Sequence, residues 1–239
     1  MKKGFEFRAS SLKERREFYE KEFDINKVKA FFNENKIPIP QICALDAGSD
    51  SGIIENKEWN NNLFYLEFKD LAKKIKKYNP EDVYYDRSVY ENPKKVLDEL
   101  KFEDYLLQEL AFDIDADNIS DVSHEDTEEY EKVIDRAYDY ALKLKKELEK
   151  EFERVIIVYS GRGFHIEVLD EKANKLNNEE RGALAEKFSK YPIDPWVSRG
   201  YIRLLRIPYT LNAVVSRISL PIMNIFNSKE TIPDFLKNS

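Results

Sequence analysis

The stretch VIIVYSGRGFHIEVL, residues 155–169, decides the fold. Its first five residues are apolar and mostly β-branched, which predicts a buried strand over 155–159. The Ser-Gly-Arg-Gly sequence predicts a turn over 160–163, and the alternating residues after it predict a second strand over 164–169. We therefore expect these two strands to form a β-hairpin.

The turn of this hairpin has the composition of an anion-binding site. Gly161 and Gly163 allow the backbone to approach a ligand closely, and Ser160 and Arg162 add donors that suit phosphate. His165, one of two histidines in the chain, is expected at the start of the next strand. The alternative is a tight hairpin without a ligand.

A second chemical motif lies upstream, in the sequence LAFDID at residues 110–115. Side chains two apart on a strand point to the same face, so Asp113 and Asp115 should present adjacent carboxylates. Oxygen-only ligands of this kind suit Mg²⁺ or Mn²⁺. The alternative is a strand edge with two solvated acids, although aspartate is unfavourable in strands.

The segment between the two motifs has the 3.6-residue rhythm of a long helix over 126–152. Ser123, with Asp126 three residues later, is expected to cap it. A crossover of this length should return the chain to the same sheet and bring the turn near the acidic strand.

The remaining patterns complete an α/β or α+β class with a mixed sheet. They predict two helices before Pro38, the first capped by Ser11 and Glu14, a helix over 68–78, a short strand from 83, a helix over 178–190 and strands within 201–222. We expect one domain over residues 1–239.

The composition excludes several classes of protein. No apolar run reaches the length of a membrane span, and one cysteine among 239 residues excludes internal disulfides and multi-cysteine zinc sites. A cytoplasmic protein follows. The net charge of −7 does not announce nucleic-acid binding, but acids gather over 103–139 and four arginines over 191–220. On charge alone, solvated surfaces are the preferred interpretation.

A third motif lies downstream of the first two. Asp194 precedes Pro195, and the sequence Arg206-Ile207-Pro208 follows. The order of the three motifs resembles the small catalytic subunit of archaeal and eukaryotic DNA primases, over most of residues 10–222. The resemblance implies an α+β fold, a mixed β-sheet catalytic core with an RRM-like half, flanked by helices.

The sequence departs from that family in three respects. The zinc module expected between the first two motifs is replaced by the helix over 126–152, and a long helical insertion before Asp194 is missing. Asn212 and Val214 stand where the family commonly has a His and a Lys that contact triphosphate. Arg217 lies close by and is a candidate substitute.

The resemblance implies two-metal nucleotidyl transfer that builds short primers on single-stranded DNA. Asp113, Asp115 and Asp194 would bind two Mg²⁺ or Mn²⁺ ions, without zinc. The triphosphate would be held by the turn and the basic residues, namely Ser160, Gly161, Arg162, Gly163, His165, Arg206 and Arg217. Arginines around 199–217 would contact the template electrostatically.

The implied partners are a single-stranded DNA template, nucleoside triphosphates and a large primase subunit, but no membrane. The location would be cytoplasmic, or nuclear in a eukaryote. Three alternatives stay open: a related end-joining or gap-filling polymerase, a non-catalytic nucleic-acid-binding primase subunit, and an unrelated α/β domain with chance motifs.

Overall fold

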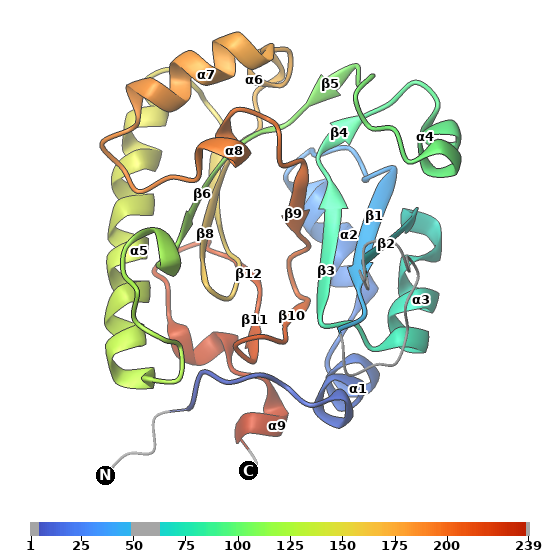
Figure 1. Cartoon of the computed structure of the whole chain (residues 1–239), viewed down its shortest axis with the longest axis vertical. Coiled ribbons are helices and arrows are strands. Elements are labelled where there is room, and N and C mark those ends of the chain that lie inside the picture. The colour runs from blue at the N-terminus through green and yellow to red at the C-terminus, as the bar shows by residue number, and fades with distance from the viewer. Residues whose placement is uncertain (1–4, 49–62, 238–239) are drawn as a thin grey trace.

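The structure, a computed structural model, describes residues 5–48 and 63–237 (Figure 1). Two four-stranded sheets lie side by side, with helices on their outer sides. The chain alternates between them, because β9 (Leu204–Arg206) returns from the second half to the sheet of the first.

The first sheet has the order β2-β1-β3-β9, with strands β2 (Leu63–Glu67), β1 (Ile42–Asp46) and β3 (Asp82–Asp86). Three helices accompany it: α1 (Leu12–Lys21), α2 (Ile25–Glu34) and α3 (Leu71–Tyr78). Ser11 and Glu14 form the expected capping box of α1. The apolar positions of α1, α2 and α3 enter one core with β1 and β3.

The second sheet has the order β12-β7-β8-β6 and is built from β6 (Leu110–Asp115), β7 (Val155–Tyr159), β8 (Gly163–Val168) and β12 (Leu220–Pro221). Helix α5 (Thr127–Leu148) joins β6 to β7 and packs across the sheet, and α7 (Asn178–Lys187) lies on the same side (Figure 1). The hairpin and the crossover predicted from the sequence are confirmed.

Shorter elements connect these two halves. Two-stranded ladders pair β4 (Ser88–Val89) with β5 (Leu107–Gln108) and β10 (Leu211–Asn212) with β11 (Arg217–Ile218). The other helices are α4 (Pro93–Glu99), α6 (Glu171–Asn174), α8 (Pro195–Ser198) and α9 (Asp234–Lys237), and short 3₁₀ turns cover Phe68–Asp70, Ala116–Asn118 and Ser228–Thr231.

Two expectations need correction. Every strand pairing among the described residues is antiparallel, so the mixed sheet is wrong in that detail, while the α+β class with flanking helices is confirmed. Strands β6 and β7 run in the same direction, as a helical crossover requires, but β8 lies between them. Helix α5 is capped by Asp126, whose side chain accepts from the Glu129 N–H, and not by Ser123.

The β6–β8 pairing separates two faces of the second sheet. Phe112 and Ile114 on β6, with Phe164 and Ile166 on β8, belong to the core beneath α5. The intervening residues of both strands point to the opposite face, toward the first sheet. Ala111 and Val158 on that face join the core of the first half. The space between the two sheets therefore receives the polar residues of β6 and β8.

Candidate active site

The acidic strand and the histidine meet directly across the sheet. Asp113 pairs with His165, and Asp115 pairs with Gly163. The Nε2 atom of His165 lies 3.7 Å from Oδ1 of Asp113. His165 was expected at the start of its strand, but it lies inside β8 and is only 7% exposed.

The turn over 160–163 needs both of its glycines. Gly161 has φ of +104°, and a Cβ there would lie 2.5 Å from the Cβ of Asn212. At Gly163 a Cβ would lie 2.2 Å from the carbonyl oxygen of Ile114, so only glycine lets β8 pair this closely with β6. Asn212 donates its side-chain N–H to the carbonyl of Ser160 at 3.1 Å and so holds the turn.

Asp194, which follows α7 in the chain, lies next to Asp113. Its backbone N–H donates to the carbonyl of Asp113 at 2.8 Å, which fixes the start of α8 against β6. A cavity of about 250 Å³ opens here between the two sheets. Its lining includes Asp113, Asp115, Ser160, Arg162, His165, Asp194, Arg206, Asn212 and Val214.

Burial dominates the electrostatics of this cavity. The pKa of Asp113 is raised well above its ordinary value, first by burial and then by the charges of Asp115 and Asp194. Its Oδ1 atom is buried without a hydrogen-bond partner. Burial, with Arg206 and Arg87 nearby, lowers the pKa of His165 to about 3, so the imidazole is neutral.

Comparison with known proteins identifies the family. The family described as "DNA primase small subunit" matches residues 112–192. An uncharacterized DNA primase small subunit-like protein of Archaeoglobus fulgidus is 35% identical over 259 aligned residues, which cover 97% of this chain and 92% of that protein. The chain belongs to the DNA primase small subunit family.

Longer members of the family are also similar. The DNA primase small subunit PriS of Pyrococcus furiosus is 28% identical over 90% of this chain and 62% of its own length. For PriS of Thermococcus sibiricus the values are 27%, 85% and 59%. This chain thus spans about 60% of these two relatives. In the part that the structure describes, no helix is long and apolar enough to cross a membrane.

Most of the side chains expected to bind phosphate line the cavity, but one of them does not. Ser160, Arg162, His165 and Arg206 line the cavity, and Arg206 also donates to Asp82 at 2.6 Å. Arg217 does not reach the cavity.

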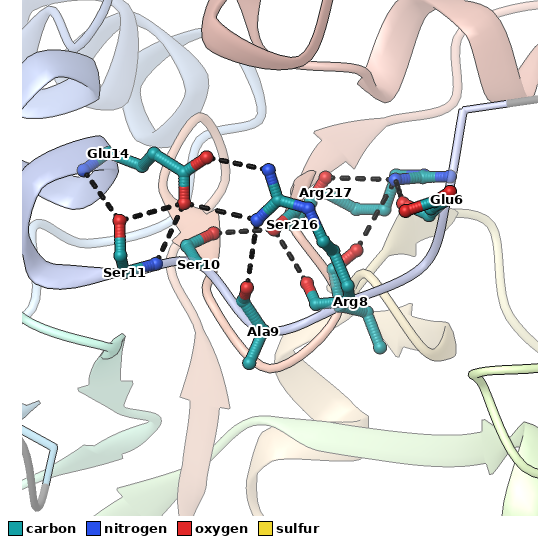
Figure 2. A network of polar contacts seen from close by, with 9 residues as sticks. Glu6, Arg8, Ala9, Ser10, Ser11, Glu14, Ser216 and Arg217 are labelled. Carbon is teal, nitrogen blue, oxygen red and sulfur yellow. Dashed lines mark hydrogen bonds and ion pairs between the residues drawn. The ribbon is translucent and has the colours of Figure 1, made fainter. Parts of the chain in front are cut away.

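Arg217 is buried beside the N-terminal segment (Figure 2). It donates to the backbone carbonyls of Phe5, Glu6, Val215 and Ser216, and its guanidinium lies 3.7 Å from the centre of the Phe7 ring. The role suggested for Arg217 as a substitute for the missing triphosphate contacts is therefore not supported.

The arginines around 199–217, which were expected to contact the template, mostly pair with carboxylates of the protein. Arg203 pairs with Asp86 at 2.9 Å, and Arg206 pairs with Asp82. Arg199, which is more exposed, lies 3.6 Å from Glu186. Pairing within the fold leaves these guanidinium groups little charge to offer a template strand.

The chemistry of the carboxylates fits a divalent cation, although no three His, Cys, Asp or Glu side chains among residues 5–48 and 63–237 are arranged to hold one. Arg162 donates to Asp115 at 2.9 Å, and Oδ1 of Asp194 accepts from the Trp196 N–H at 2.7 Å. Asp113, with its partnerless buried oxygen, is the group that most needs a cation.

Two groups of residues at the site were missed by the sequence analysis. Asp82 and Tyr84 line the cavity from β3. The strand was expected only from residue 83, so the two-residue spacing that places Asp82 and Tyr84 on one face was missed. Glu167 follows His165 by two residues on β8 and is fully buried, with Oε1 4.0 Å from Nδ1 of His165. The same parity rule could have placed Glu167 on the polar face.

Proposed function

We propose that this protein catalyses DNA-templated nucleotidyl transfer of the primase type, using two divalent metal ions. One observation supports the proposal above the others. Asp113 and Asp115, with Asp194 from a distant part of the sequence, line one cavity together with Ser160, Arg162 and His165. Carboxylates on one side and phosphate donors on the other form the layout that phosphoryl transfer requires.

In this proposal Asp113, Asp115 and Asp194 hold Mg²⁺ or Mn²⁺. Bound metal would activate the attacking 3′-hydroxyl and neutralise the charge on the triphosphate. For that, Arg162 has to leave Asp115. The Arg162 side chain is one-third exposed, so it can turn toward the incoming phosphates. The bound nucleotide would then gain a donor as the carboxylate gains a metal ion.

His165 and Arg206 complete the proposed nucleotide site. Because burial keeps the imidazole of His165 neutral, its protonated ring nitrogen can donate a hydrogen bond to a phosphate oxygen. A neutral imidazole also forms no ion pair with Asp113, so that carboxylate stays available to a metal ion. Arg206 is fixed by its ion pair with Asp82 and lines the cavity from the first sheet, where its guanidinium would donate a hydrogen bond to a phosphate oxygen. The nucleoside triphosphate, the single-stranded template and a large primase subunit are the partners of this proposal.

A second candidate, a non-catalytic nucleic-acid-binding subunit, is favoured by one observation. Asn212 stands at the position where primases commonly have a triphosphate-contacting His, and its side-chain amide donates to the Ser160 carbonyl instead. Activity therefore decides between the two candidates.

The test uses a closed circle of single-stranded DNA, labelled nucleoside triphosphates and Mn²⁺ or Mg²⁺. We expect short products from the wild-type chain and none from Asp115→Asn. Asp117→Asn is the matched control, because Asp117 also pairs with Arg162, at 3.0 Å, but does not line the cavity.

Products on the circle indicate initiation, because a closed circle has no end to extend. Extension of an annealed primer without products on the circle would assign the protein to the end-joining or gap-filling class. If neither substrate is used with either metal, the non-catalytic candidate replaces the proposal.

A further inference from the structure

Two exposed aromatic side chains lie beside the candidate active site. Trp196 is 61% exposed and Tyr201 is 55% exposed, and their ring centres are 5.5 Å apart. Among the aromatic residues that the structure describes, these are the two classed as exposed. Large exposed apolar groups that cluster on a surface usually mark a binding site.

The segment that presents them is held firmly by the fold. The N–H groups of Tyr201 and Ile202 both donate to the carbonyl of Trp196, at 3.0 and 3.1 Å. The buried guanidinium of Arg87 donates to the carbonyls of Val197 and Ile202. A surface fixed in this way loses little conformational entropy when a ligand binds.

This aromatic pair is joined to the catalytic cavity. Asp194, one of the proposed metal ligands, accepts a hydrogen bond from the Trp196 N–H. Val197 and Ile202, which directly follow Trp196 and Tyr201 in the chain, line the cavity. A ligand on Trp196 and Tyr201 would therefore lie next to the reacting atoms.

Charge indicates what kind of ligand fits. A polymer held mainly through its phosphates would need free cations, but Arg199, Arg203 and Arg206 all lie within 4 Å of carboxylates and the net charge is −7. Flat aromatic rings can instead stack on nucleobases of any sequence.

We infer that Trp196 and Tyr201 form a stacking platform for unpaired bases of the single strand that enters the active site. This inference rests on the proposed function for its choice of ligand. According to this inference, base stacking supplies most of the binding free energy for the strand, and phosphate contacts supply a small part.

The test compares two fluorescein-labelled 12-mers with equal numbers of phosphates: oligothymidylate and a fully abasic strand. Binding to the full-length chain is followed by fluorescence anisotropy in EDTA without nucleotides. We expect oligothymidylate to bind about 5- to 150-fold more tightly than the abasic strand, the range for stacking on one base. Its affinity should also depend only weakly on salt.

Trp196→Ala should remove most of that preference while leaving binding of the abasic strand unchanged. Trp196→Phe should retain it. Met223→Ala, at an 81% exposed apolar residue outside this pair, is the matched control and should behave as wild type.

Equal affinity for the two strands, no measurable binding of oligothymidylate, or equal loss of both strands in Trp196→Ala would overturn the inference. The first two results with a protein that still makes primers would point to a protein partner for this surface. Base-dependent binding by a protein that transfers no nucleotide would refute the proposed function and leave the platform standing.

Discussion

Replacing Asp113 by asparagine should stabilise the metal-free protein while abolishing nucleotidyl transfer. The Asp113 carboxylate is buried, its Oδ1 has no hydrogen-bond partner, and Asp115 and Asp194 add like charge. Leaving a buried polar group unsatisfied costs about 1–3 kcal/mol, and more when the group is charged. Asparagine has nearly the same shape and places a neutral amide where Asp115 and Asp194 repel a carboxylate. Removing that repulsion and the cost of burying the charge should stabilise the metal-free protein by about 1–3 kcal/mol.

That gain can be converted into a melting temperature. At about 2.1 cal/mol/K per residue, a chain of this length has an unfolding entropy of about 500 cal/mol/K. The Asp113→Asn variant should therefore melt about 2–6 °C above wild type in EDTA. Added Mn²⁺ should raise the wild-type Tm, by about 5 °C at one hundred times the dissociation constant, and should leave the variant unmoved.

Differential scanning fluorimetry measures both effects, and primer synthesis on circular single-stranded DNA measures activity. Asp117→Asn is the control, since the Asp117 side chain is 63% exposed and should change neither Tm nor its response to Mn²⁺. If Asp113→Asn melts below wild type in EDTA, or if its Tm still rises with Mn²⁺, the carboxylate is structural and Asp113 is not a metal ligand.

Three further predictions concern stability. Arg206→Ala leaves buried Asp82 without its partner and should cost about 3–5 kcal/mol in urea unfolding, whereas Arg199→Ala, at a more exposed pair, should cost less than about 1 kcal/mol; similar costs for the two would contradict this. Gly163→Ala places a methyl group against β6 and should give little folded protein by near-ultraviolet circular dichroism; a wild-type spectrum would show that β8 can move away. Burial raises the pKa of Glu109 from 4.5 to about 7, so the folded state binds more protons between these values and loses up to about 3 kcal/mol of stability as pH rises through them. Glu109→Gln should flatten that slope of Tm against pH, and an unchanged slope would exclude Glu109 as its source.

The hairpin and its acidic neighbour could be predicted because their information is local. Residues 155–169 contain the strand, turn and strand in one stretch, and two-residue parity places Asp113 and Asp115 on one face. The family resemblance supplied Asp194, which short-range patterns alone describe only as a turn residue. Its hydrogen bond to Asp113 depends on where α7 returns the chain, and no sequence period encodes that return.

The arginines show why residue type is a poor guide to a binding role. Arg206 and Arg217 were both assigned to the triphosphate from their place near the third motif. In the fold, β9 directs Arg206 into the cavity, while the turn after β10 directs Arg217 toward the carbonyls of residues 5 and 6. A guanidinium can donate to backbone carbonyls as well as to phosphate, because both present oxygen acceptors. Only the tertiary course of the N-terminal segment separates the two outcomes.

The candidate site belongs to both halves of the molecule, and this constrains how it can work. Asp113 and His165 come from the second sheet, whereas Asp82 and Arg206 come from the first. The cavity exists only where the polar face of β6 and β8 meets the ends of β3 and β9. Any relative movement of the sheets would change the distance from the phosphate donors to the carboxylates, and rates of phosphoryl transfer depend steeply on that positioning. The buried contacts that hold the two sheets together include the hydrogen bonds from Arg87 to the carbonyls of Val197 and Ile202. They touch no reacting atom, but they affect the proposed reaction because they fix its geometry.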